Sequence, residues 1–141
     1  MYDDIMLPVD PESVTASSKA IETAVRIAQD YGATLHILSV IPRLGRYAAN
    51  IFPEDFAEEN ADTVKRTLEQ IGSDIALQTE RLRLHVATGS VYDEIITLSR
   101  KAEIDLIVLA SHRPELSDYL LGPNAARVVR HADCSVMVVR G

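Results

Sequence analysis

The residues whose types suit ligand chemistry gather in two short stretches. The carboxylate of Asp10 directly follows the first apolar run of the chain, and the cations His112 and Arg113 directly follow a later one. Gly122 precedes a helical pattern, where a glycine lets a phosphate approach free backbone N–H groups and the positive end of the helix dipole. Together they indicate a site for an anionic small molecule. The alternative is that Asp10 is a turn residue, Gly122 a cap, and the two cations loop surface.

Other chemistries lack the spacing that they need. The six glycines are at least thirteen positions apart, so the chain has no Walker A loop and no dinucleotide glycine fingerprint. No serine lies in a nucleophile elbow, and the four histidines and Cys134 form no metal-ligand pattern. His36 and His85 fall inside expected strands and are interpreted as partly buried structural residues. We expect no dedicated enzyme.

The hydrophobic pattern predicts the elements that position these residues. Strands are expected at 5–9, 34–41, 82–86, 105–110 and 135–139. Helices are expected between them. The first helix carries Ile21, Ala24, Val25 and Ala28 on its buried side and ends at Gly32, and the second runs from about Ala57 to Gly72 or Ala76. The third helix begins after a Ser90 cap and runs to Ala102. The last helix begins at Pro123 and faces inward through Ala125, Val128, Val129 and Ala132.

Strict alternation of strand and helix predicts an α/β fold: a three-layer sandwich with a five-stranded parallel sheet and helices on both faces, as in flavodoxin-like and Rossmann-like proteins. We expect a single domain over residues 1–141. The first and fourth strands are the most apolar and are placed at the centre. In such sheets a ligand lies outside the carboxyl ends of the strands, where the winding direction switches. The site is therefore predicted at the tips 8–10 and 110–113.

The composition and net charge limit the classes of partner that the protein can bind. Apolar residues make up 47% of the chain and charged residues 25%, an ordinary globular balance. The 14 basic and 21 acidic residues give a net charge of −7, which disfavours nucleic acid and anionic lipid, and Arg127, Arg130 and His131 make too small a basic patch to change that. No apolar run is long enough to span a membrane, the first residues are acidic, and there is one cysteine. We expect a cytoplasmic protein.

Three stretches resemble a known family. The frame Ile-Met-Leu-Pro-Val-Asp at 5–10, the run from Ala110-Ser111-His112 through Leu121-Gly122, and the segment 134–140 together resemble the universal stress proteins, over the whole chain. The resemblance is nearest to the small single-domain bacterial branch with an Ala-Ser-His-Arg-Pro opening and a Leu-Leu-Gly-x-Asn-Ala close. It implies a regulatory or protective module of the bacterial stress response.

The resemblance also implies that ATP or ADP binds, with Mg²⁺ held by phosphate oxygens and Asp10, and that any ATP hydrolysis or self-phosphorylation is slow and incidental. The residues matching the nucleotide site are Pro8, Val9, Asp10 and Val40 on the adenosine side, and Ala110, Ser111, His112, Arg113, Gly122, Pro123, Asn124 and Ala125 around the phosphates. The chain departs from the family's phosphate loop: Ala110 and Arg113 replace glycines, the spacer is one residue shorter, and Pro123 replaces a serine. Proline removes a hydroxyl and a backbone donor.

Two further expectations concern partners and alternatives. The apolar segment 135–139 has no charge before Arg140, so as an edge strand it would pair with its copy in a homodimer. A phosphoacceptor receiver domain is disfavoured because Val86-Ala87-Thr88-Gly89 supplies no acidic residue at the third strand's tip. A nucleotide α-hydrolase or ligase is disfavoured because no glycine-rich loop follows the first strand. A nucleotide-independent interaction module of the stress-protein fold stays open.

Overall fold

The computed structural model describes residues 1–43, 56–111 and 123–141. The strands are β1 (Asp4–Pro8), β2 (Thr34–Ile41), β3 (Leu82–Thr88), β4 (Leu106–Ser111) and β5 (Ser135–Arg140). The helices are α1 (Ser18–Tyr31), α3 (Phe56–Asp74), α4 (Val91–Lys101) and α5 (Pro123–His131). Two short 3-10 helices, η1 (Val14–Ser17) and η2 (Thr79–Arg81), precede α1 and β3.

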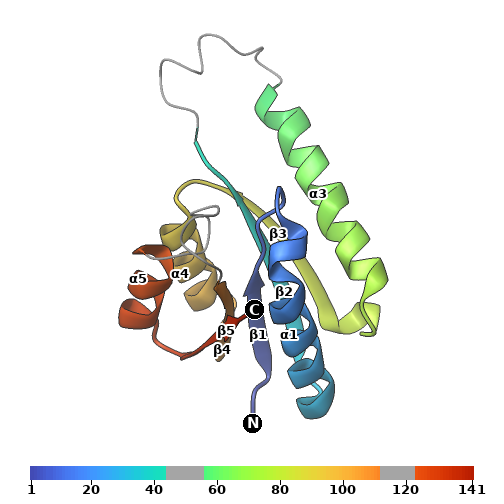
Figure 1. Ribbon diagram of the computed structural model, residues 1–141, viewed down its shortest axis with the longest axis vertical. Helices are drawn as coiled ribbons and strands as arrows, with labels where there is room; N and C mark the ends of the chain where they lie inside the picture. Colours follow the sequence, from blue (N-terminus) through green and yellow to red (C-terminus); the bar gives the residue numbers. More distant parts are fainter. Residues whose placement is uncertain (44–55, 112–122) are drawn as a thin grey trace.

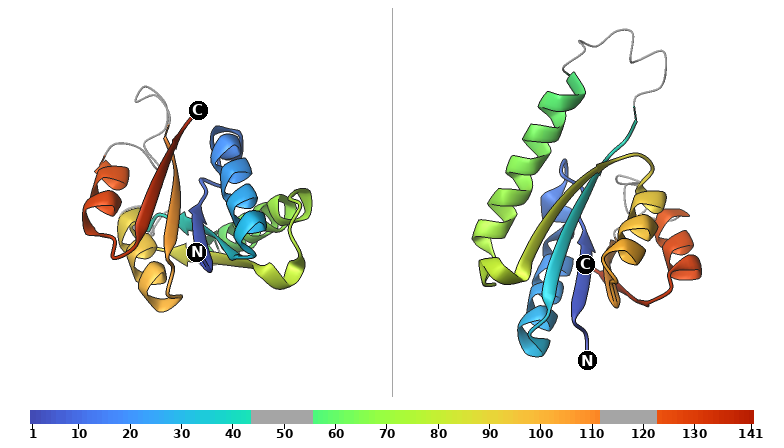
Figure 2. Two further views of the ribbon diagram at one scale, coloured as in Figure 1. Left: turned by 90° about the horizontal axis from the view of Figure 1, so that it is seen from below. Right: turned by 180° about the vertical axis from the view of Figure 1, so that it is seen from behind.

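The five strands form one parallel sheet in the order β3-β2-β1-β4-β5. Helices α1 and α3 cover one face and α4 and α5 the other (Figures 1 and 2). This arrangement confirms the expected α/β class and the three layers. It also confirms that the first and fourth strands are neighbours at the centre and that the last strand is an edge.

Burial separates the inner strands from the two edges. Every residue of β1, β2 and β4 is buried apart from one terminal residue in each, as expected for parallel strands covered on both faces. The edge strands β3 and β5 instead alternate between partly buried and exposed residues. The hydrophobic core therefore lies along β1, β2 and β4 and the inward faces of the helices.

The helix boundaries follow the local signals. Gly32 adopts the left-handed conformation (φ 66°) that ends α1, and Ser90 caps α4 by accepting a hydrogen bond from the Asp93 backbone N–H. Helix α3 continues through Gly72, because one interior glycine costs only about 1 kcal/mol relative to alanine.

One helix-face prediction was wrong. Val128 is fully buried, but Val129 is 53% exposed. Adjacent helical positions point about 100° apart, and the short helix α5 covers the sheet near its edge, so its buried stripe is too narrow to include both valines. Within the described residues, no helix is long and apolar enough to cross a membrane.

Candidate functional site

The carboxyl end of the central strand holds the candidate site's one buried carboxylate. Asp10 lies two residues beyond β1 and is 8% exposed. Its Oδ1 accepts a hydrogen bond from the Glu12 backbone N–H at 2.9 Å, and its carbonyl accepts from the Ser13 N–H at 3.2 Å. Asp10 therefore does form the turn that was considered as the alternative to a ligand-binding role. It occupies one carboxylate oxygen, and among the described residues the second oxygen accepts no hydrogen bond, so turn formation and ligand binding are compatible.

The backbone beside Asp10 is fixed by the neighbouring strand. The Val9 N–H donates to the Leu38 carbonyl at 2.8 Å, and the Ser39 hydroxyl donates to the Val9 carbonyl at 2.7 Å. Val9 and Val40 are both fully or almost fully buried. The result is a rigid apolar base under the tip of β1, of the kind that holds a binding group in one geometry.

A hollow of about 220 Å³ brings two of the predicted residues together. Asp10 and Val40 line it, across the tips of β1 and β2. The opposite wall comes from α3, whose N-terminal turns extend past the carboxyl edge of the sheet (Figure 1). Its polar members are Asn60, Thr63 and Thr67.

The sequence reasoning missed this α3 wall. Asn60, Thr63 and Thr67 recur at i, i+3 and i+7, which places them on one side of the helix beside the buried Val64. This stripe of polar residues is the sequence pattern from which the α3 wall could have been predicted. The hydroxyls of Thr63 and Thr67 donate to the carbonyls of Glu59 and Thr63 in the helix itself, so both hydroxyl oxygens keep lone pairs for a ligand.

Only part of the predicted phosphate-binding side of the site lies within the described residues. Ala110 is buried and Ser111 partly buried at the tip of β4, next to β1 in the sheet. Helix α5 begins at Pro123, with Asn124 and Ala125 partly buried in its first turn. The predicted residues His112, Arg113 and Gly122 lie outside the described residues. Pro8, the last residue of β1, is buried beneath the site.

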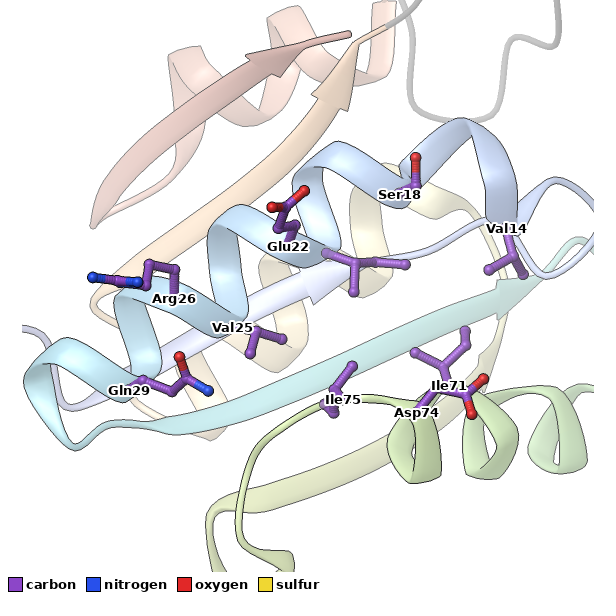
Figure 3. A pocket seen from close by; sticks show the side chains of 10 residues that line it. Val14, Ser18, Glu22, Val25, Arg26, Gln29, Ile71, Asp74 and Ile75 are labelled. Atoms are coloured by element: carbon purple, nitrogen blue, oxygen red, sulfur yellow. The ribbon is translucent and has the colours of Figure 1, made fainter.

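A second hollow lies elsewhere and contains none of the predicted residues. It measures about 560 Å³ and separates α1 from α3 (Figure 3). Its floor is apolar, with Ile21, Val25 and Ile71, while Glu22 and Asp74 stand at its rim. It is larger than the hollow at Asp10, but it lies beside the helices and away from the strand tips, where the switch-point argument places a ligand.

Two electrostatic observations concern groups that could take part in chemistry, a thiol and the acidic side chains. Burial, followed by the nearby carboxylates of Asp105 and Asp133, raises the pKa of the Cys134 thiol, which makes it a poor nucleophile at neutral pH. Within the described ranges no group of three or more His, Cys, Asp or Glu side chains is arranged to hold a metal ion. A single carboxylate such as Asp10 still suits Mg²⁺ that arrives with phosphate oxygens.

The sequence of the whole chain places it among known proteins. A sequence model described as the universal stress protein family matches residues 1–140. The chain belongs to the universal stress protein family. It is 37% identical over 145 residues to "Universal stress protein G" of Escherichia coli O157:H7, covering 99% of this chain and 100% of that protein. The protein of the same name from Salmonella typhimurium is 34% identical, with the same coverage.

Solved structures of universal stress proteins share the fold. UspA from Lactobacillus plantarum superposes with a TM-score of 0.78 at 27% identity, covering 99% of this chain and 98% of that one. A universal stress protein in complex with cAMP has a TM-score of 0.66 at 20% identity, covering 99% and 97%. The family predicted from the motifs at 5–10, 110–122 and 134–140 is thus confirmed.

Proposed function

We propose that this universal stress protein binds an adenine nucleotide, ATP or ADP, at the carboxyl ends of β1, β2 and β4, and that it acts as a regulatory or protective module in the stress response. The observation that carries the proposal is the hollow in which Asp10 and Val40, predicted from distant parts of the sequence, lie together. The nucleotide-independent interaction module is the alternative.

The hollow suits a purine base. Its lining is apolar at Val40 and Ile41 and polar at Asp10 and Asn60. A flat heterocycle needs apolar surface against its faces and hydrogen-bonding groups at its edge, and small-molecule sites generally combine the two in this way. Asp10 would accept from an exocyclic amine or a ribose hydroxyl, while Asn60 would both donate and accept.

The phosphates would extend from this hollow across the tip of β4 toward the start of α5, where the helix dipole favours negative charge. Asn124 stands in the first turn of that helix. Pro123 has no backbone N–H, so we expect weaker discrimination between ATP and ADP than a serine there would give. Mg²⁺ would be held mainly by the phosphate oxygens, with Asp10 as the protein ligand. Any hydrolysis would be slow and incidental.

The same proposal includes a homodimer through β5. That strand is an edge, and Met137 and Val138 on it are exposed apolar residues. An edge strand with unpaired backbone groups and exposed apolar side chains favours pairing with a second strand. A copy related by a two-fold axis would supply one in antiparallel orientation. The cAMP complex of a relative with this fold is consistent with adenine-nucleotide binding here.

Titration calorimetry with ATP, ADP and Mg²⁺ tests the nucleotide proposal. We expect binding by the wild type and at least tenfold weaker binding by Asp10→Ala, because the buried carboxylate is the polar anchor of the hollow. Asn60→Ala should weaken binding less. Asp74→Ala, a carboxylate of the other hollow, is the matched control and should bind as the wild type does. No heat from the wild type with millimolar nucleotide, together with no co-purified nucleotide by mass spectrometry, would favour the interaction module.

A further inference from the structure

Two histidines and an aspartate form a hydrogen-bonded chain across three adjacent strands. His36 on β2 places its Nε2 3.0 Å from Asp4 Oδ1 on β1, and its Nδ1 3.0 Å from His85 Nε2 on β3. The two imidazole rings are nearly parallel, at 17°, with centroids 5.3 Å apart. The chain therefore links the edge strand β3, through β2, to the centre of the sheet. It contains no residue of the candidate nucleotide site.

The central member of this chain is shielded from water. The His36 side chain is 9% exposed, against 35% for Asp4. Asp4 is itself fixed by its neighbour, because its backbone N–H donates to Asp105 Oδ1 at 3.2 Å. A second carboxylate, that of Asp105, thus faces the acidic end of the chain. The carboxylates are held at the β1 end, away from β3.

Two cations lie near the β3 end of the chain. Arg83 is two residues before His85 on β3, and Lys101 is the last residue of α4. Burial lowers the pKa of His85 below its usual 6.5, and the nearby His36, Lys101 and Arg83 lower it further. Burial and these three groups therefore all disfavour the charged form of His85.

Proton counting shows what the contact between the two rings permits. With both rings neutral, His36 donates from Nε2 to Asp4 and accepts at Nδ1 from the His85 Nε2–H. With one added proton, His36 donates from both nitrogens and His85 accepts at Nε2. With a second added proton, two N–H groups face one another at 3.0 Å, and no acceptor remains between them. The contact therefore cannot persist when both rings are charged.

We propose that the Asp4–His36–His85 chain is a proton-sensitive latch that holds the edge strand β3 against β2 at neutral pH and loosens it in mildly acidic solution. The latch has a direction, because the Asp4 carboxylate accepts a hydrogen bond from His36 at one end, while Lys101 and Arg83 oppose the charged form of His85 at the other. The element that responds is β3, an edge strand whose backbone pairs in the sheet with β2 alone.

The sign of the effect follows from linkage. When β3 is closed, His85 binds a proton less readily than when the strand is open and the ring is in water. Closure is therefore favoured most above about pH 6.5, and the advantage is lost as the pH falls below that value. For one proton, the opening constant of β3 rises by up to about tenfold per pH unit in that range.

Amide hydrogen exchange of the full-length protein at pH 7.5 and 5.5 tests the latch. His85→Gln keeps an N–H that can donate to His36 but cannot titrate. At each pH, the β3 exchange rate of the wild type is divided by that of His85→Gln, so that the intrinsic pH dependence of exchange cancels. We expect this ratio to rise several-fold, up to about tenfold, between pH 7.5 and 5.5, and the same ratio for β5 to stay constant.

The control is His131→Gln, which removes an exposed histidine on α5. It should keep the wild-type acid response of β3. A β3 ratio that does not change with pH, or an equal loss of the response in His131→Gln, would overturn the proposal. If His85→Gln does not fold by circular dichroism, imidazole NMR of the wild type decides. A His85 ring that titrates at its ordinary value, independently of His36, refutes the latch, whereas coupled titration with acid-induced opening of β3 supports it.

Discussion

The two edges of the sheet differ although both strands are amphipathic and both expose a valine to a similar extent. Val86 on β3 is 37% exposed and Val138 on β5 is 40% exposed. On β3, charged and titratable side chains flank the valine, since Arg83 and His85 precede it. On β5, Met137 and Val138 stand together without a charge before Arg140.

The covering helices differ as well. The 19-residue helix α3 packs along β3, whereas α5 beside β5 has 9 residues and leaves its own Val129 exposed. Charge on an edge strand and a helix over it are two of the ways in which proteins prevent unwanted pairing of an edge. Both edges are covered by helices of this chain, since α3 packs along β3 and both α1 and α5 contact β5. Only β3 carries charged side chains beside its exposed valine, so β5 is the edge that better suits a partner strand.

The largest expected effect is a loss of stability when the packing of α3 over the β3 edge is weakened. Leu68 is fully buried in α3, so Leu68→Ala leaves a cavity under that helix. It should lower the free energy of unfolding by about 2–5 kcal/mol, measured by urea denaturation. Val129→Ala, on the exposed face of α5 beside the other edge, should change it by less than about 0.5 kcal/mol. Similar losses in the two variants would mean that the edges are covered equally.

The next effect concerns pairing at the other edge. Val138→Lys would place two like charges near each other across an antiparallel β5–β5 pair, which is unfavourable. We expect the dimer dissociation constant to rise by roughly tenfold to a hundredfold, about 1.4–2.8 kcal/mol, by sedimentation analysis. Val86→Lys, at the equally exposed position on β3, should leave the dimer intact. A monomeric wild type at tens of micromolar, or dissociation by Val86→Lys alone, would contradict the assignment of β5 as the interface.

Most of the fold could be predicted because its signals are local. The strands predicted at 5–9, 34–41 and 105–110 lie at 4–8, 34–41 and 106–111, and Gly32 and Ser90 marked helix ends correctly. The edge position of the last strand was assumed as a condition of the dimer prediction, and the strand order meets that condition. Val129 was misassigned because the width of a buried stripe depends on what the helix packs against, which periodicity alone does not report.

The candidate site was harder to predict because it joins distant segments. Asp10 and Val40 could be named from topology and family resemblance, but Asn60 and Thr67 depend on how far α3 rises past the sheet. The His36–His85 contact shows the same limit. Both histidines were interpreted as partly buried, which is right for His85, whereas His36 is buried at 7% exposure. Their pairing depends on the β2–β3 register, which sets Leu38 opposite His85 and His36 opposite Arg83.

The smallest expected effect is on the stability of the junction between β3 and the helix α4 that follows it. Ser90 Oγ accepts from the Asp93 backbone N–H at 3.2 Å and donates to Asp93 Oδ2 at 2.9 Å, at the point where β3 passes into α4. Ser90→Ala should cost about 1 kcal/mol of unfolding free energy, because one N–H at the helix start loses its acceptor, and Ser90→Thr should recover most of it. Ser135→Ala, at the exposed first residue of β5, is the matched control and should be nearly neutral. Equal losses at both positions would mean that the cap adds nothing specific to the β3 edge, whereas a loss at Ser90 alone places one more stabilising contact on the edge that carries charged side chains.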